Sequence, residues 1–240
     1  MSRLPVVLLA ILALGLTAFV ATGCGDDEGS DGGSSAPADT ESSQSDGTTD
    51  PQTGCKEVEQ PPPRDGGDAK KPSGKLAPGK RYDVTLVTSC GDMTFRMSQK
   101  VSPNATASFV SLAKNGFYDD TIFHRIVPGF VIQGGDPTAS GSGGPGYSTV
   151  DTPPSGTTYD KGVVAMAKAG PEPPGTAGSQ FYVVTGDAAQ FTPDYAVLGK
   201  VVKGLDVVER IDRLGDPNSG ELGTPLQAVV IESAKVDVSS

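Results

Sequence analysis

The pattern of apolar and polar residues becomes regular from about residue 82 onward. YDVTLVT (82–88) and MTFRM (93–97) alternate β-branched or aromatic residues with polar ones on either side of a turn that contains Cys90 and Gly91, and this pattern predicts a β-hairpin. Many short strands between turn signals are typical of a small antiparallel barrel or sandwich. Six further strand-like runs follow, separated by Gly- and Pro-rich connections: IFHRIV (122–127), FVIQG (130–134), GVVAMA (162–167), QFYVVT (180–185), AVLGKVV (196–202) and AVVIES (228–233).

Two segments have helical signals instead. Ser102-Pro103 is typical of a helix start and Asn115-Gly116 of a helix end, and Phe109, Leu112 and Ala113 between them share one face. The segment GLDVVERIDRL (204–214) predicts a second helix, whose Leu205, Val208 and Ile211 are spaced three apart. We therefore expect a mainly β domain with two helices that close the ends of a barrel.

The first 24 residues, MSRLPVVLLAILALGLTAFVATGC, place Arg3 before a long apolar run that ends in small residues and a cysteine. This order predicts a secretory signal peptide over residues 1–23. The ending ATGC resembles the lipobox of bacterial lipoproteins, in which Cys24 would carry the lipid. The alternative is one uncleaved membrane helix from Leu4 to Ala21. Both alternatives place the rest of the chain outside the cytoplasmic membrane, because Arg3 stays on the inner side.

Residues 24–80 have the composition of a linker. Residues 25–54 are rich in Gly, Ser, Asp and Thr and almost free of apolar residues, so we expect this part to be a disordered, acidic tether. Residues 60–80, QPPPRDGGDAKKPSGKLAPGK, are Pro-rich and basic, and the folded domain is predicted to cover residues 81–240. The formal net charge of −10 argues against nucleic acid and against adhesion to an anionic membrane, which leaves the lipid anchor as the membrane contact.

The residue inventory excludes several kinds of chemistry. The chain has one histidine, three cysteines, and no motif for a serine hydrolase, a zinc protease, a phosphate-binding loop or a dinucleotide fold. We therefore expect no metal and no cofactor.

The neighbouring residues His124 and Arg125 lie in a predicted strand, so alternation points their side chains to opposite faces. A single strand histidine is most often a hydrogen-bonded packing residue. An arginine in an apolar strand either pairs with a carboxylate or points into a cleft, where its fork of donors can hold a substrate oxygen. Gln133 and Gln180 add two amides, which fit a binding pocket for a neutral ligand or simply satisfy neighbouring backbone groups.

Five segments in this order, FHRIVPGFVIQGGD, GSGGPGY, GVVAMAKAG, GSQFYVVT and YAVLGKVVKGLDVVERI, resemble the signature segments of the cyclophilin family over residues 82–238. The resemblance implies a closed eight-stranded antiparallel β-barrel capped by two α-helices. It also implies peptidyl-prolyl cis-trans isomerase activity on Xaa-Pro segments of unfolded or secreted polypeptides, by a monomer without a cofactor.

The resemblance also assigns roles to residues. Arg125 would be the catalytic residue, Gln133 would steady it, and His124 would lie outside the catalytic role. Phe130, Val131, Tyr182 and Phe191 would form the pocket for the proline ring, and Ala167 and Gln180 would contact the substrate backbone.

This sequence departs from the family pattern at Lys168, where the family often has asparagine, and in the loop GPEPPGTAG (170–178), which is longer than usual. The family's frequent tryptophan is absent, Gln190 or Phe191 takes its place, and Tyr195 stands where a histidine is common. These departures affect the expected substrate preference. Two other functions compete with isomerase: a module that binds Pro-containing segments without turning them over, and a purely structural surface lipoprotein. The presence of Arg125, Phe130 and Gln133 together argues against both.

With Cys24 lipidated, Cys55 and Cys90 are an even pair in an oxidising compartment. We expect a disulfide between them that holds the end of the linker across the hairpin edge, which would otherwise offer unpaired backbone groups. The alternative is two free thiols.

Overall fold

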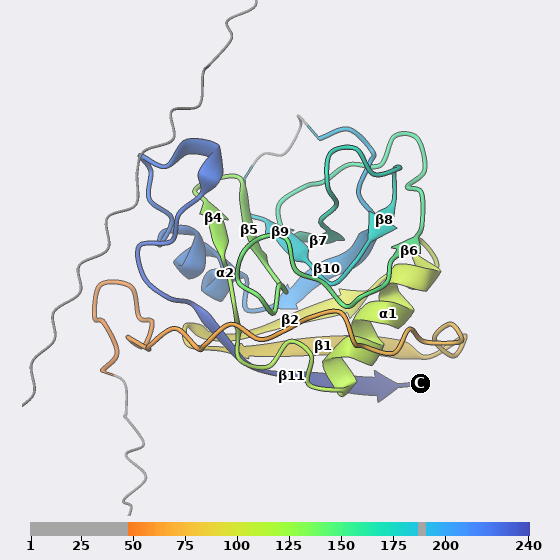
Figure 1. Ribbon diagram of the computed structural model, residues 1–240, viewed down its shortest axis with the longest axis horizontal. Coiled ribbons are helices and arrows are strands. Elements are labelled where there is room, and N and C mark those ends of the chain that lie inside the picture. Colours follow the sequence, from red (N-terminus) through yellow and green to blue (C-terminus); the bar gives the residue numbers. More distant parts are fainter. Residues whose placement is uncertain (1–47, 187–190) are drawn as a thin grey trace, which may run out of the picture. The chain divides into compact units, whose positions relative to one another are not determined.

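The computed structural model describes residues 48–186 and 191–240 (Figure 1). The predicted signal peptide, the lipidation site Cys24, the first part of the predicted linker and Gln190 lie outside these residues. None of the helices within them is long and apolar enough to cross a membrane. The elements are β1 (Arg81–Thr88), β2 (Gly91–Met97), α1 (Pro103–Lys114), β3 (Thr121–Ile122), β4 (Arg125–Val127), β5 (Val131–Gly134), β6 (Thr149–Val150), β7 (Val163–Met166), β8 (Thr176–Ala177), β9 (Phe181–Val184), β10 (Val197–Lys203), α2 (Leu205–Asp212), the 3₁₀ turn η1 (Gly220–Leu222) and β11 (Val230–Ser239).

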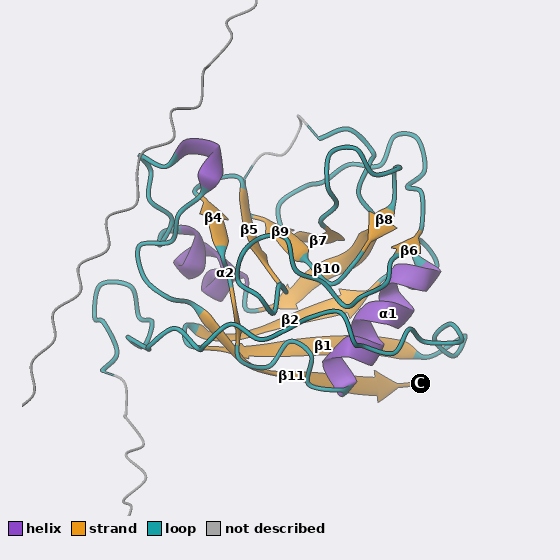
Figure 2. Ribbon diagram, viewed as in Figure 1, coloured by secondary structure: helices purple, strands orange, loops and turns teal. Residues whose placement is uncertain are grey.

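One curled antiparallel sheet dominates the domain (Figure 2). Its strand order is β3-β11-β1-β2-β10-β7-β9-β5-β4, and β6 and β8 form a separate pair. The two end strands, β3 and β4, are separated by only two residues of chain, and a bridge joins Ile122 of β3 to Asp136, which follows β5. The predicted mainly β, antiparallel fold with two helices is confirmed.

The strand count differs from the expected eight, because the predicted strand 122–127 is divided. The backbone N–H of Phe123 still bonds to Val229, which precedes β11, whereas Arg125 pairs with Gln133 of β5. The chain therefore changes its pairing partner at His124. This change of partner directs Arg125 to the edge of the sheet where the site lies.

Helix α1 begins and ends where the local signals predict, although its N-terminus is stabilised differently. Ser102 occupies the cap position, but its hydroxyl makes no capping bond. The carboxylate of Asp151 instead accepts hydrogen bonds from the backbone N–H groups of Asn104 (2.9 Å) and Ala105 (2.6 Å). A carboxylate at this end satisfies free N–H groups and complements the helix dipole.

Helix α2 lies within its predicted range, and two of its three predicted apolar positions are buried. Val208 and Ile211 are buried together with Val207, whereas Leu205 is exposed, so the prediction was wrong for Leu205 alone. Leu205 is the first helical residue, directly after Gly204 in the left-handed conformation (φ 77°), and its side chain lies beyond the edge of the core.

The core inside the curled sheet is rich in aromatic rings. The ring of Phe181 in β9 lies 5.4 Å from that of Phe109, 5.8 Å from Tyr118, 5.9 Å from Phe95 and 6.0 Å from Phe123. Because side chains alternate along a strand, the next residue of β9 points to the opposite face. That opposite face carries a second apolar cluster of Val131, Tyr159, Val163, Ala165, Tyr182 and Val184, with Phe130, Ala167, Phe191, Tyr195 and Val197 packed on it.

The segment before β1, residues 48–80, has almost no regular secondary structure and runs across the domain (Figure 1). We call residues 56–80 the strap. A disulfide joins Cys55 to Cys90 in the β1–β2 turn, and both cysteines are buried. Further along, Arg64 Nη2 donates to the carbonyl oxygens of Phe117 (2.8 Å) and Asp119 (2.7 Å). The strap therefore lies against the domain at several points.

Candidate active site

A cavity of about 350 Å³ opens on the outer face of β4, β5 and β9. A second cavity of about 370 Å³ adjoins it and shares Gln133, Ala167 and Lys168 with it. Gln180 lines only the second cavity. The first cavity is lined by Arg125, Phe130, Val131, Gln133, Ala167, Lys168, Tyr182, Phe191, Tyr195 and Glu221, so the structure brings all the residues of the predicted site together in two neighbouring cavities.

Strand register explains why three of these side chains meet. Arg125 of β4 pairs with Gln133 of β5, and Gln133 pairs with Tyr182 of β9. Residues directly opposite each other on antiparallel strands project from the same face of the sheet. The guanidinium, the amide and the phenol ring therefore form a row across three strands.

Hydrogen bonds fix the guanidinium of Arg125 in place. Its Nη1 donates to Gln133 Oε1 (3.2 Å) and its Nε donates to the backbone carbonyl of Glu221 in η1 (2.9 Å). Gln133 Nε2 in turn donates to Gln180 Oε1 (3.0 Å). Burial lowers the pKa of Arg125 from its ordinary value, yet an arginine keeps its charge at neutral pH. Only two of its five N–H groups are used by the described residues, which leaves donors for a ligand.

Gln180 is held by the loop that follows β5. Its Nε2 donates to the carbonyl oxygens of Gly141 (2.9 Å) and Gly143 (3.0 Å). The buried carboxylate of Asp136 holds this loop, because it accepts from the backbone and hydroxyl of Thr138 and from the backbone of Gly143. Burial alone would raise the pKa of Asp136, but these hydrogen bonds outweigh burial and lower its pKa. The row of hydrogen bonds thus extends from Asp136 through the loop to Arg125.

Aromatic rings form the apolar part of the first cavity. The ring of Phe191 stacks on Phe130 (4.9 Å, 18°) and on Tyr182 (5.4 Å, 21°). Tyr195 meets Tyr182 edge-on (5.5 Å, 87°), and the hydroxyl of Tyr159 fixes Tyr195 by donating to its carbonyl (2.7 Å) and accepting from its N–H (3.0 Å). Burial raises the pKa of Tyr182 far above its ordinary value, so this phenol stays neutral. The cavity suits a small apolar ring.

A side chain of α2 holds the turn that carries Phe130. The backbone N–H of Gly129 donates to both carboxylate oxygens of Asp212 (3.0 and 3.1 Å), which also accepts from the hydroxyl of Thr185 (2.6 Å). A charged acceptor makes each of these bonds stronger than a neutral pair. The position of Phe130 therefore depends on the last residue of α2.

His124 is not among the residues that line either cavity. Neither of its ring nitrogens has a hydrogen-bond partner among the described residues. Burial lowers its pKa, so the ring is neutral at physiological pH. The expected hydrogen-bonded packing residue is therefore packed without the hydrogen bond.

The supports of the site that are not part of the sequence prediction include Asp136, Asp212, Tyr159 and the carbonyl of Glu221. A carbonyl contact leaves no signal in the identity of a side chain. Asp136 directly follows Gly134-Gly135, and an aspartate after glycines at a strand end is a turn signal that marks such a loop. In residues 48–186 and 191–240, no three His, Cys, Asp or Glu side chains are close enough together to hold a metal ion.

Comparisons with known proteins agree with this geometry. The family model described as cyclophilin type peptidyl-prolyl cis-trans isomerase/CLD matches residues 83–236. The chain is 35% identical over 169 residues to peptidyl-prolyl cis-trans isomerase CYP18-2 of Arabidopsis thaliana, a match that covers 66% of this chain and 95% of the relative. It is 37% identical over 173 residues to peptidyl-prolyl cis-trans isomerase B of Streptomyces anulatus, with 64% and 95% covered.

Among solved structures, the chain is similar to a cyclophilin type peptidyl-prolyl cis-trans isomerase of Cryptosporidium parvum. The TM-score is 0.59 at 30% identity, and the match covers 67% of this chain and 99% of that chain. A second crystal structure of that protein was determined in the presence of the dipeptide Ala-Pro. The part matched by the family model, residues 83–236, contains both cavities but not the strap.

Proposed function

This chain belongs to the cyclophilin-type peptidyl-prolyl cis-trans isomerases, and from that premise we propose how its site works and where it acts. It is a peptidyl-prolyl cis-trans isomerase, and its substrates are proline-containing peptides. In the proposed mechanism, Arg125 stabilises the twisted prolyl amide without any covalent intermediate. The proposed location is the outer face of the cytoplasmic membrane of a bacterium, where the enzyme would assist the folding of secreted polypeptides.

The barrier to this reaction comes from amide resonance and is about 18–20 kcal/mol. In the twisted state conjugation is lost, and the prolyl nitrogen becomes pyramidal and can accept a hydrogen bond. The observation that carries the mechanism is the orientation of Arg125, whose guanidinium is held by Gln133 and Glu221 in the cavity that the aromatic rings also line. A donor fixed before the substrate binds need not be reorganised during the reaction.

The other side chains are assigned by their chemistry. Phe130, Val131, Tyr182 and Phe191 would hold the proline ring, since they form the apolar part of the first cavity. Ala167 lies where the two cavities join, and Gln180 lies in the second cavity. Both would contact the substrate backbone next to the proline. The dipeptide used with the Cryptosporidium parvum relative supports an Xaa-Pro unit as the part that is bound.

One charge-assisted hydrogen bond contributes about 1.5–3 kcal/mol. Each 1.36 kcal/mol corresponds to about a factor of ten in rate, so Arg125 accounts for roughly a tenfold to hundredfold acceleration. Positioning of the substrate in a reactive shape by the aromatic cavity would supply the rest.

A coupled assay on an Ala-Pro peptide tests this mechanism with the full chain, a buffer blank and the variant Arg125→Lys. Lysine keeps the positive charge but lacks the planar fork. We expect the full chain to accelerate isomerisation and the lysine variant to retain only a small part of the acceleration. Equal rates for both proteins would contradict the role of the fork, and a rate equal to the blank for the full chain would favour a module that only binds.

The proposed location rests on the sequence before residue 48 and on the disulfide. A basic residue, an apolar run and the ending ATGC precede a tether, and a disulfide such as Cys55–Cys90 is typical of an oxidising compartment. Membrane fractionation of the variant Cys24→Ala tests lipidation. We expect the variant to leave the membrane fraction; if it stays there, an uncleaved membrane helix is the better explanation.

A further inference from the structure

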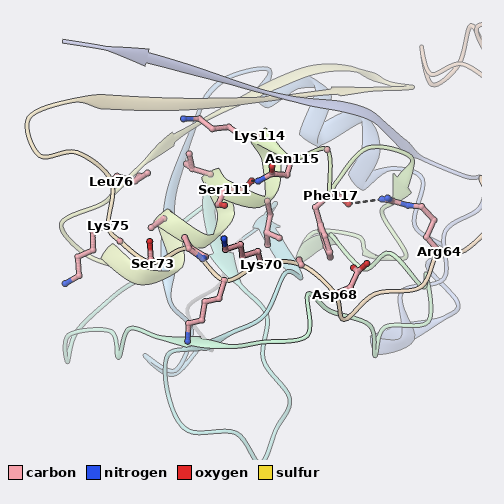
Figure 3. A pocket seen from close by; sticks show the side chains of 18 residues that line it. Arg64, Asp68, Lys70, Ser73, Lys75, Leu76, Ser111, Lys114, Asn115 and Phe117 are labelled. Atoms are coloured by element: carbon pink, nitrogen blue, oxygen red, sulfur yellow. Dashed lines mark hydrogen bonds between the residues drawn. The ribbon is translucent and has the colours of Figure 1, made fainter.

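The strap and α1 enclose a groove that the isomerase mechanism does not use (Figure 3). Its volume is about 780 Å³, and it shares no lining residue with the two cavities of the active site. One wall consists of residues 64–76 and the other of α1 and the turn that follows it. Because the family match begins at residue 83, the first wall is an addition to the family domain.

The groove is basic although the chain is acidic. Five cationic side chains line it, Arg64, Lys70, Lys71, Lys75 and Lys114, against one acidic side chain, Asp68, whereas the whole chain has a net charge of −10. None of these five cations forms an ion pair within residues 48–186 and 191–240. Clustered cations repel one another, and a bound anion relieves that repulsion.

Three of the cations have structural contacts. Arg64 bonds two carbonyl oxygens in the turn after α1, and Figure 3 shows its bond to Phe117. Lys71 Nζ donates to the carbonyl of Ser148 (2.8 Å), and Lys114 Nζ lies 6.0 Å from the centre of the Tyr82 ring. These contacts fix the walls, so the groove is formed before any ligand arrives.

Lys70 and Lys75 are different, because both are exposed and neither has a hydrogen-bond partner among the described residues. Figure 3 shows both side chains at the groove, with Lys75 extending toward its outer end. Their ammonium groups are therefore available to a ligand.

The remaining lining points to the kind of ligand. It includes apolar side chains such as Leu76, Val110 and Phe117 next to polar ones such as Ser111 and Asn115. A small inorganic anion would leave the apolar part unused, and a flat bilayer surface would reach only the rim of a recess. A polypeptide with both acidic and apolar side chains fits charge and surface together.

We propose that this groove is a second polypeptide-binding site, which takes an acidic segment of a client protein. It holds the client by a stretch that need not contain proline. The active site then samples the client's Xaa-Pro bonds at a raised effective concentration. Binding in the groove does not depend on the roles assigned to Arg125 or the aromatic cavity, so the two assignments can fail separately.

The test is fluorescence anisotropy of the full chain with a fluorescein-labelled, proline-free peptide in which Asp and Glu alternate with Leu and Ser. The variant Lys70→Gln/Lys75→Gln removes the two available cations and none of the contacts that hold the strap. We expect it to bind the peptide about twofold to thirtyfold more weakly, because it loses two exposed ion pairs that contribute about 0.2–1 kcal/mol each. Added salt should weaken binding by the unmodified chain.

The matched control is Lys203→Gln/Lys235→Gln, which removes the same charge from exposed positions of β10 and β11. It should bind as tightly as the unmodified chain, and the peptide with Asn and Gln in place of Asp and Glu should not bind. Equal weakening in both double variants would overturn the proposal, because it would show a nonspecific charge effect.

Two further measurements distinguish a client polypeptide from the other ligands that the groove could bind. Binding to phosphatidylglycerol vesicles, lost in the Lys70→Gln/Lys75→Gln variant and without any peptide binding, would assign the groove to lipid and overturn the proposal. A second variant tests whether the chain's own acidic tether occupies the groove. It has amides in place of the seven acidic residues between positions 26 and 46. If only this variant binds the peptide, the tether is the occupant and the proposal fails.

Discussion

The active-site cavity and the groove under the strap are built in two different ways. The walls of the cavity come from β4, β5 and β9, whose pairing places Arg125, Gln133 and Tyr182 in one row. One wall of the groove is an irregular segment attached by a disulfide, a few side-chain contacts and single backbone hydrogen bonds, such as those from Arg64 to Pro137 and from Ala69 to Pro145 in the loop after β5. The cavity therefore has strand register to fix its geometry, whereas the groove depends on individual anchors.

Because of this difference, mutations in the two regions should have different consequences. A change of register would move every side chain of the cavity at once, so its geometry is tied to the stability of the whole sheet. An anchor of the strap can be removed singly, and the sheet beneath it retains its pairing. Changes to the strap should thus affect stability and the groove, and changes in β4 should affect catalysis.

The largest effect should follow removal of the disulfide in Cys55→Ser/Cys90→Ser. The bridge spans 35 residues, for which the chain-entropy model gives about 3–4 kcal/mol as an upper figure. We expect the free energy of unfolding in urea to fall by up to this amount. Isomerase activity well below the unfolding transition should stay unchanged, and binding of the acidic peptide should weaken.

A loss of isomerase activity in this variant would show that the strap and the active site are coupled. A path exists, because Arg210 of α2 donates to the carbonyl of Cys90 (2.6 Å), and Asp212 of the same helix holds the turn at Gly129. Intact-mass measurement of the unmodified chain, denatured and alkylated without reductant, is the control: alkyl groups on both Cys55 and Cys90, in addition to any on Cys24, would show that the bridge does not form in solution.

The next effect is catalytic. Arg125→Ala should lower kcat/KM by roughly tenfold to a hundredfold, because it removes the charge-assisted donor. The side chain lines a cavity and is only partly buried, so its removal leaves no void in the core and the unfolding midpoint should change little. Peptide binding in the groove should be unaffected. An unchanged kcat/KM would refute the catalytic assignment.

Local signals predict much of the fold. The boundaries of α1 follow from Ser102-Pro103 and Asn115-Gly116, because proline suits the first helical turn and Asn-Gly suits a helix end, although the capping carboxylate is that of the distant Asp151. The two-residue strands β6 and β8 are absent from the prediction, because two residues cannot show a period. The division between β3 and β4 is also absent, because it arises from a change of pairing partner that is not encoded in alternation.

The residues of the candidate site also include some that the sequence predicts and some that it does not. Its cavity-lining side chains are predicted through the family resemblance, which rests on side-chain identity. Asp212 accepts from the backbone N–H of Gly129, 83 residues away along the chain, so only the folded structure reveals this support. Asp136 acts within its own loop, on Thr138 and Gly143, and its turn signal does not indicate that this loop holds Gln180. The path of the strap depends on contacts such as Arg64 with the carbonyl of Phe117, which the Pro-rich composition does not indicate.

A smaller effect concerns His124 and pH. Burial lowers the pKa of His124 below its ordinary value of 6.5, so the folded state binds fewer protons than the unfolded state in the window below pH 6.5. The stability that depends on neutral His124 is therefore complete above pH 6.5 and is lost as the pH falls from 6.5 through the folded-state pKa. His124→Gln should flatten the plot of unfolding free energy against pH in this window.

The same variant also tests whether the catalytic role belongs to Arg125 or to its neighbour His124. Since His124 lines neither cavity, His124→Gln should retain most of the activity on an Ala-Pro peptide. A loss as deep as that of Arg125→Ala would show that the catalytic role was assigned to the wrong residue of the pair.

The smallest effect should appear at Lys168, which lines both cavities of the active site. Its Nζ donates to the carbonyl oxygens of Ala169 (3.3 Å), Gly170 (3.4 Å) and Glu172 (3.0 Å), and lies 5.8 Å from the centre of the Tyr195 ring. The ammonium group thus closes the turn after β7 and adds positive charge beside the bound peptide. A peptide with glutamate next to the Xaa-Pro unit should gain from this charge.

We expect Lys168→Asn to keep the activity on a neutral peptide within about twofold and to lower kcat/KM for the glutamate peptide about twofold to fivefold, the range of an exposed charge pair. The comparison of the two peptides in one coupled assay isolates the charge, because any loosening of the turn lowers both rates together. Equal losses for both peptides would assign Lys168 to the turn alone. A selective loss would show that this cavity, like the groove under the strap, uses a lysine to select acidic polypeptides.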